Sequence, residues 1–186
     1  TGCGKTAAVL IPVLHRLRQH SLKAGARAIV LSPTRELALQ TFKFAMELQK
    51  FTDLRSACVV GGDSMEAQFS DLAQNPDLIV ATPGRLLHMV DEVEGFTIRS
   101  VTMVTLDEAD RLLEMGFSDQ LRDILKQVAE MRQTLLFSAT MPTALAEFVR
   151  VGLREPPVIR LDAAMKVSPD LKLSFTVVRI DEKIGA

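Results

Sequence analysis

The sequence predicts an α/β domain in which a parallel sheet is covered by helices on both faces. Short β-branched runs alternate with helical stretches along the chain. The runs are apolar at nearly every position, which is typical of parallel strands that are buried on both faces. A β-α-β order of this kind predicts a parallel sheet with helices packed against it.

Six runs are predicted as strands and six segments as helices. The predicted strands are residues 28–31, 57–60, 78–81, 101–106, 134–137 and 158–159. The predicted helices are residues 7–18, 36–49, 65–74, 86–90, 119–130 and 144–151. The first helix carries an apolar stripe that should pack on the sheet. Pro12 removes one backbone hydrogen bond there, so we expect either a kink or a helix still in its early turns.

The composition is that of a soluble globular domain. Of 186 residues, 47% are apolar and 24% are charged, which suits one domain with a sizeable core and a tail. The net charge of -1 excludes a general positive field, so any grip on nucleic acid must be local. Trp and Tyr are absent and most of the Phe residues lie in apolar runs, which favours contacts with phosphates and sugars over base stacking.

The cysteines and histidines indicate no metal site. Cys3 and Cys58 are isolated and lack metal-ligand spacing, so neither a disulfide framework nor a zinc site is expected, and the compartment is expected to be reducing. His15, His20 and His88 are expected on helix surfaces without a role. No apolar run approaches the length of a membrane span, so we expect no membrane partner.

The chain opens with the second half of a phosphate-binding loop that leads into a helix. Its residues are Thr1, Gly2, Cys3, Gly4, Lys5 and Thr6. Free backbone N–H groups and the helix dipole at such a position favour anions. Lys5 is predicted to meet the β and γ phosphates, and the Thr6 hydroxyl to ligate Mg²⁺. The alternative is a glycine-rich turn with a solvated lysine.

An acidic string follows the predicted strand 101–106. Asp107, Glu108 and Asp110 therefore emerge at the carboxyl end of that strand, where ligands collect in open α/β sheets. Asp107 is predicted to hold Mg²⁺, and Glu108 to orient or deprotonate the attacking water. Taken alone, the string is also an ordinary charge pattern for a helix start.

Six ordered motifs make the chain resemble the DEAD-box family of RNA-dependent ATPases over residues 1 to about 161. They are the phosphate loop, Pro33-Thr34-Arg35-Glu36-Leu37-Ala38, Gly61-Gly62, Thr82-Pro83-Gly84-Arg85, Asp107-Glu108-Ala109-Asp110 and Ser138-Ala139-Thr140. The resemblance implies a RecA-like P-loop lobe that uses ATP and Mg²⁺ and binds the RNA backbone without regard to sequence.

The same resemblance assigns an RNA path and a coupling group. The RNA path is lined by Pro33, Thr34, Arg35, Gly61, Gly62, Thr82, Pro83, Gly84 and Arg85. Arginines, hydroxyls and glycine amides are suitable phosphate contacts. Without the family, Thr34 is a helix cap and Thr82-Pro83-Gly84 a tight loop. Ser138 and Thr140, with Asp110, are implied to couple the nucleotide site to RNA binding; the alternative is a loop that caps the helix beginning near Pro142.

The resemblance also implies parts of the protein outside the first lobe. We expect the chain to be cut short at both ends, with a lobe at residues 1–161, a linker at 162–171 and the start of a second RecA-like lobe at 172–186. The similarity extends to members that mature the large ribosomal subunit, which implies pre-ribosomal partners and a nuclear, nucleolar location, or otherwise a cytoplasmic one. The alternatives to an RNA helicase are an ATP-gated RNA clamp or scaffold with little turnover and a DNA translocase.

Overall fold

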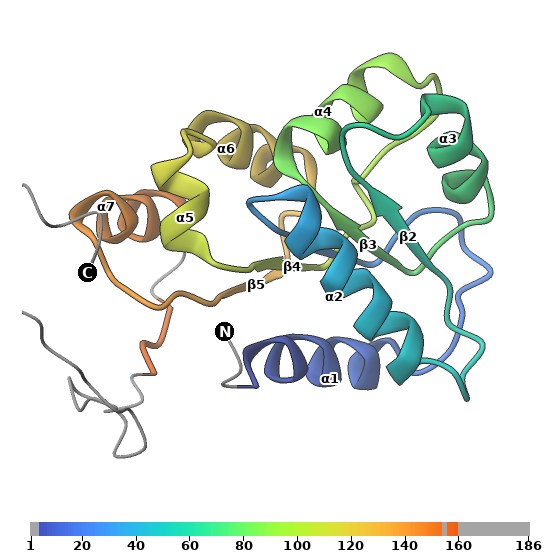
Figure 1. The fold of residues 1–186 in the computed structure, drawn as a ribbon, viewed down its shortest axis with the longest axis horizontal. Coiled ribbons are helices and arrows are strands. Elements are labelled where there is room, and N and C mark those ends of the chain that lie inside the picture. Colours follow the sequence, from blue (N-terminus) through green and yellow to red (C-terminus); the bar gives the residue numbers. More distant parts are fainter. Residues whose placement is uncertain (1–3, 154–155, 160–186) are drawn as a thin grey trace, which may run out of the picture. The chain divides into compact units, whose positions relative to one another are not determined.

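A computed structural model describes residues 4–153 and 156–159 of the chain. The chain divides into two compact units, Thr1–Glu155 and Pro156–Ala186. Every helix and strand of the described residues belongs to the first unit (Figure 1). The predicted linker and second-lobe start, residues 162–186, lie outside the described residues.

A five-stranded parallel sheet forms the middle of the first unit. Its strands are β1 (Ala28–Leu31), β2 (Ser56–Val59), β3 (Leu78–Ala81), β4 (Met103–Leu106) and β5 (Gln133–Leu136), arranged in the order β2-β3-β1-β4-β5. All four pairings are parallel, which confirms the predicted sheet. Leu31 pairs with both Ala81 and Leu106, so the three central strands end level at one edge.

The predicted strand at residues 158–159 is wrong. Val158 and Ile159 have no regular secondary structure and are 60% and 87% exposed. A strand of a parallel sheet needs neighbours that bury both of its faces, and these two side chains lack that burial. Two β-branched residues in succession were too short a signal to predict a strand.

Seven helices accompany the strands within the described residues. They are α1 (Lys5–Leu17), α2 (Arg35–Leu48), α3 (Met65–Ala73), α4 (Pro83–Glu92), α5 (Ala109–Glu114), α6 (Ser118–Gln127) and α7 (Thr143–Gly152). Helix α4 begins earlier than predicted because Pro83, whose fixed φ suits the first helical position, starts its first turn. Pro12 lies in the middle of α1, so the early-turn alternative is wrong. No described helix has both the length and the apolar character to cross a membrane.

The core consists of two apolar clusters, one on each face of the sheet. Alternate residues of β1 divide between them: Ala28 and Val30 join the cluster of α1 and α2, and Ile29 and Leu31 join the cluster of α4 to α7. Successive strand residues point to opposite faces, and all four are buried. The structural model therefore confirms a sheet covered by helices on both faces (Figure 1).

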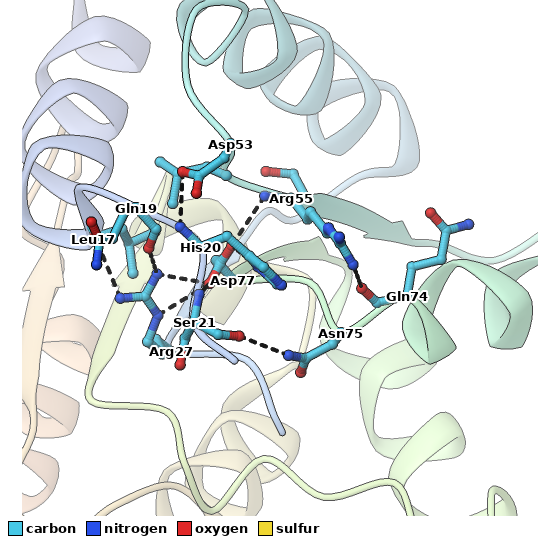
Figure 2. Close-up of polar contacts among 12 residues, drawn as sticks. Leu17, Gln19, His20, Ser21, Arg27, Asp53, Arg55, Gln74, Asn75 and Asp77 are labelled. Atoms are coloured by element: carbon cyan, nitrogen blue, oxygen red, sulfur yellow. Dashed lines mark hydrogen bonds and ion pairs between the residues drawn. The ribbon is translucent and has the colours of Figure 1, made fainter. Parts of the chain in front are cut away.

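A buried carboxylate organises the amino edge of the sheet (Figure 2). Asp77, which directly precedes β3, accepts hydrogen bonds from His20 Nδ1 at 2.9 Å and from Arg27 Nη2 at 2.7 Å. The backbone N–H groups of Ser21 and Arg55 also donate to it, each at 3.0 Å. One side chain thus joins the loops that lead into β1 and β2 to the start of β3.

The prediction that His20 lies on a helix surface is therefore wrong. Helix α1 ends at Leu17, and Arg18 follows with a φ of 60° in the left-handed region. The chain leaves the helix there, and the His20 side chain, only 11% exposed, turns inward to Asp77. A single histidine near a helix end carries no sequence signal of this partner, which lies 57 residues away.

Candidate functional site

The predicted motifs meet at the carboxyl edge of the sheet, opposite the Asp77 network. Residues 33–35, 61–62 and 82–85 follow β1, β2 and β3, while residues 107–110 and 138–140 follow β4 and β5. Because the strand order is β2-β3-β1-β4-β5, the edge has two halves. One half carries the motifs predicted to bind RNA, and the other the motifs predicted to bind the nucleotide.

The described end of the phosphate loop begins helix α1. Gly4, at the N-cap, has a φ of 76°, a left-handed conformation that glycine adopts without steric cost. Lys5 and Thr6 are the first residues of the helix, and its first turn contains no acidic side chain. The positive end of the helix dipole is therefore free to attract an anion. Thr1, Gly2 and Cys3 lie outside the described residues.

Asp107 is a buried carboxylate beside this helix start. It is only 4% exposed, and burial, followed by the negative charge of Glu108, raises its pKa. The Glu108 N–H, which donates to Asp107 Oδ1 at 3.1 Å, and the charge of Lys5 oppose that shift. A cation bound beside Asp107 would stabilise the ionised form of this carboxylate.

The residues present fit Mg²⁺ at this position. Asp107 offers a carboxylate and Thr6 a hydroxyl, and Mg²⁺ prefers oxygen ligands. Within the described ranges, no group of three His, Cys, Asp or Glu side chains could enclose a metal ion. Mg²⁺ is commonly held by one or two protein oxygens together with water and substrate phosphates, which matches this sparse set.

Glu108 has a strained backbone. Its φ of 49° and ψ of 54° lie in the left-handed region, which costs a non-glycine residue roughly 1–3 kcal/mol. Neighbouring hydrogen bonds hold it there: its carbonyl accepts from Leu112 N at 3.0 Å, and Ala109 N donates to Phe137 O at 2.9 Å. Backbone strain at this candidate catalytic base is a feature that the sequence did not predict.

Asp110 connects the loops after β4 and β5. Its Oδ2 accepts from the Thr140 hydroxyl at 2.7 Å and from the Thr140 N–H at 3.0 Å. The Asp110 N–H donates to Ser138 Oγ at 3.3 Å, and the Ser138 hydroxyl donates to the Thr140 carbonyl at 2.7 Å. Burial acts to raise the pKa of Asp110, but the hydrogen bonds of Thr140, Ser138 and the Arg111 N–H together outweigh it, so the pKa is lowered. The three predicted coupling residues thus form one network.

The other half of the edge is organised by two arginines. Arg35, the first residue of α2, donates to the Gly61 carbonyl and forms an ion pair with Asp63 at 2.6 Å. Arg85, in the first turn of α4, donates to the Asp63 carbonyl at 3.2 Å. The side chains predicted to bind RNA therefore converge on the loop after β2.

The buried side chain of Gln68 holds the loop after β2 in place. This side chain, 3% exposed, donates to the Val60 carbonyl at 2.9 Å and accepts from the Val60 N–H at 3.2 Å. Its Oε1 also receives Arg85 Nε at 3.4 Å. Neither Gln68 nor Asp63 was predicted as a site residue, because a polar residue on a helix and an aspartate in a turn carry no sequence signal of their own.

The structural alternative is confirmed for Thr34 but is wrong for Thr82-Pro83-Gly84, because Pro83 and Gly84 form the first turn of α4 and not a tight loop. Thr34 Oγ1 accepts from Leu37 N at 3.2 Å, so it caps α2 as the alternative predicted. Thr82 is the extended N-cap of α4 but makes no side-chain capping bond. Capping orients these residues at the helix starts and does not exclude a phosphate contact.

Comparison with known proteins settles the family. The family model described as DEAD/DEAH box helicase matches residues 1–148. The chain belongs to the DEAD/DEAH box helicase family.

Several relatives and solved structures of this family resemble the lobe. The chain is 61% identical over its full length to the putative DEAD-box ATP-dependent RNA helicase 29 of Arabidopsis thaliana, of which it covers 22%. It is 58% identical over its full length to the ATP-dependent RNA helicase DBP10 of Chaetomium globosum, of which it covers 24%. The chain thus spans less than a quarter of the length of these curated relatives.

The solved structures confirm the RecA-like character of the fold. The yeast DEAD-box splicing factor Prp28 matches with a TM-score of 0.76 and 33% identity, over 83% of this chain and 38% of that one. A DEAD box protein from Methanococcus jannaschii matches with the same TM-score and 34% identity, over 83% of this chain and 41% of that one. This DEAD-box lobe therefore has the predicted fold class.

Proposed function

We propose that this DEAD-box lobe binds ATP with Mg²⁺ at one half of the carboxyl edge and the RNA sugar-phosphate backbone at the other. The protein that contains it is then an ATP-dependent RNA helicase that remodels RNA duplexes or RNA–protein complexes. The strand order carries this proposal, because it places the two sets of motifs on adjoining halves of one edge. The names of its relatives support the same activity.

In the nucleotide half, each residue has a distinct role. Gly4, with the preceding residues Thr1, Gly2 and Cys3, would cradle the phosphates with backbone N–H groups, and Lys5 would meet the β and γ phosphates. Thr6 and Asp107 would hold Mg²⁺, which neutralises charge on the phosphates when bound. The backbone strain at Glu108 supports a role for its carboxylate in orienting or deprotonating the attacking water.

In the RNA half, contacts to the backbone would be independent of sequence. Arg35 and Arg85 supply positive charge, and Thr34 and Thr82 supply hydroxyls. Pro33, Gly61 and Gly62 lie in the loops after β1 and β2, and Pro83 and Gly84 form the first turn of α4; these positions would let an RNA backbone approach. These groups suit phosphates and sugars, and the described surface offers no Trp or Tyr for base stacking. A second RecA-like lobe of the same protein would complete both sites on closure.

The Asp110 network would couple the two halves. Ser138 and Thr140 lie in the loop after β5, next to the acidic loop after β4, and their hydrogen bonds make the positions of the two loops depend on each other. A change at the phosphates that moves Asp107 or Glu108 would therefore reach Thr140. That connection supports coupling residues that do not themselves perform the chemistry.

Replacement of Glu108 by Gln tests the proposal. In the full-length protein, Glu108→Gln should slow RNA-stimulated ATP hydrolysis by about 10²- to 10⁴-fold, the usual contribution of a positioned acid or base. Binding of fluorescent ATP and of RNA should persist. Glu114→Gln makes the same charge change on an exposed residue of α5 and should leave the rate unchanged. A Glu108→Gln enzyme that hydrolyses ATP at the normal rate would overturn the assignment.

The setting in the cell is a separate proposal. The resemblance to members that mature the large ribosomal subunit supports pre-ribosomal particles as partners and a nuclear, nucleolar location. A tagged full-length protein should accumulate in nucleoli and sediment with pre-ribosomal particles. A purely cytoplasmic distribution would contradict this proposal without touching the enzymatic one.

A further inference from the structure

We propose that Asp63 is an intramolecular competitor for RNA phosphate. By pairing with Arg35 when RNA is absent, it sets how tightly the lobe holds RNA. The inference rests on the proposed function, because it requires Arg35 to bind a phosphate. What it adds is a carboxylate that the sequence motifs do not include.

The geometry of the pair supplies the first argument. Arg35 Nη2 lies 2.6 Å from Asp63 Oδ1, while Arg35 Nη1 donates to the Gly61 carbonyl. Both terminal nitrogens of the guanidinium are thus engaged within the loop after β2. A phosphate that binds Arg35 with two parallel hydrogen bonds needs at least one of these nitrogens, because each two-donor edge of a guanidinium includes a terminal nitrogen. Arg35 therefore cannot bind the Asp63 carboxylate and a phosphate in this way at the same time.

The exposure of the pair supplies the second argument. The side chains of Arg35 and Asp63 are 37% and 43% exposed, so a phosphate can approach from solvent. The hydrogen bond from Arg35 lowers the pKa of Asp63, and the charge of Arg85 acts in the same direction. Asp63 is therefore an anion under physiological conditions, with the charge and acceptor oxygens to imitate a phosphate.

The loop itself does not depend on the ion pair. Arg85 donates to the Asp63 carbonyl, and Gln68 hydrogen bonds to both polar groups of Val60. These contacts hold the main chain on either side of Gly61 and Gly62 when the Asp63 side chain leaves. The exchange of partners thus requires a side-chain rotation and no rearrangement of the backbone.

The close approach of the Arg35 guanidinium to Gly62 is consistent with an exchange of Asp63 for phosphate. A Cβ on Gly62 would lie 3.4 Å from Arg35 Nη1, at the near limit of ordinary contact. The φ of 89° at Gly62 also disfavours any side chain there. The guanidinium therefore lies against bare backbone, beside the position proposed for the RNA strand.

The test measures the affinity of full-length protein for RNA with a fluorescent single-stranded oligouridine, Mg²⁺ and a non-hydrolysable ATP analogue. Asp63→Asn keeps the shape of the side chain and removes its charge. It should lower the Kd for RNA about two- to fivefold, as expected for release of an exposed arginine from an ion pair. The dependence of log Kd on log salt should steepen by up to about 0.7, the value for one phosphate of a single strand. Asp63→Glu should retain the competitor and stay near the unmodified Kd.

Two matched variants make the result specific. Asp119→Asn also neutralises an exposed carboxylate paired with an arginine, Arg122 at 3.2 Å, and should not change the Kd. In an Arg35→Gln background, Asp63→Asn should lose its effect. A gain that persists there would show that Asp63 acts by general repulsion, and an equal gain in Asp119→Asn would show a net-charge effect. Either result overturns the proposal.

The remaining outcomes separate this proposal from the one on which it rests. If Asp63→Asn weakens binding, Asp63 orients Arg35 for RNA and does not compete, so the competitor is excluded while the RNA path stands. An unchanged Kd with Asp63→Asn also excludes the competitor. If Arg35→Gln alone leaves the Kd unchanged, the RNA path at Arg35 fails, and the competitor fails with it.

Discussion

Asp77 and Asp110 lie at opposite edges of the same sheet, and each joins loops that are distant in the sequence. Asp77 is 1% exposed, and its partners include the Arg27 guanidinium and the His20 ring. Asp110 is 6% exposed, and its partners are backbone N–H groups and the Thr140 hydroxyl. One carboxylate is bound by a fixed cation and the other by a small group that can rotate.

The different partners of Asp77 and Asp110 indicate how easily each edge of the sheet can rearrange. An ion pair whose carboxylate is buried, as at the amino edge, resists rearrangement, because separation would leave the Asp77 charge without a partner. A hydroxyl on the exposed Thr140 can exchange its acceptor at small cost, since water can replace it. The amino edge of the sheet should therefore remain rigid, whereas the hydrogen bonds at the carboxyl edge can rearrange.

The largest expected effect is at the amino edge. Asp77→Asn in the full-length protein should destabilise the lobe by roughly 3 kcal/mol, the lower end for a buried pair, because Asp77 is buried while the Arg27 side chain is 28% exposed and keeps contact with water. For a domain of this size, that corresponds to a fall of about 6–12 °C in the melting temperature of the lobe. Differential scanning calorimetry measures it, with Asp119→Asn as the exposed control. A loss no larger than that of the control would mean that the amino edge is not rigid.

A smaller effect on stability is expected at the carboxyl edge, with a larger one on coupling. Replacement of both Ser138 and Thr140 by Ala should cost about 1 kcal/mol of stability, the net value of ordinary hydrogen bonds. ATP hydrolysis should largely remain, while strand separation weakens, since these hydroxyls connect the sites without performing the chemistry. Both rates are measured on one preparation. Equal loss of the two activities would point to general damage of the lobe.

The smallest effect concerns acid stability. The pKa values of Asp77 and Asp110 are lowered in the fold, so both carboxylates add stability above the unfolded pKa of about 3.9. That contribution is lost as the pH falls through the folded pKa, by at most about 1.4 kcal/mol per pH unit for each proton. Melting temperatures measured below pH 4 should fall less steeply in Asp77→Asn than in the unmodified protein.

The comparison between edges predicts a weaker response from Asp110→Asn in the same titration. The Arg27 guanidinium and the His20 ring bind Asp77 in addition to N–H groups, whereas no arginine, lysine or histidine side chain hydrogen bonds to Asp110 within the described residues. Replacement of Asp77 should therefore flatten the acid limb more than replacement of Asp110. The reverse order would show that the carboxyl edge, and not the amino edge, dominates acid unfolding.

The sequence by itself determined the sheet and the positions of the motifs. Apolar runs at 28–31 and 78–81 match β1 and β3, because a strand that is buried on both faces must be apolar throughout. The motifs also had to share one edge, since the carboxyl ends of parallel strands point the same way. Local chemistry of this kind depends on residues that are near one another in the chain.

Tertiary structure decided which residues meet across the loops. The pairings of Arg35 with Asp63 and of His20 with Asp77 join residues 28 and 57 positions apart. No periodicity or motif encodes such distances, because they follow from the strand order and from where each loop returns to the sheet. The left-handed backbone of Glu108 has the same origin: neighbouring loops hold a conformation that the residue alone would avoid.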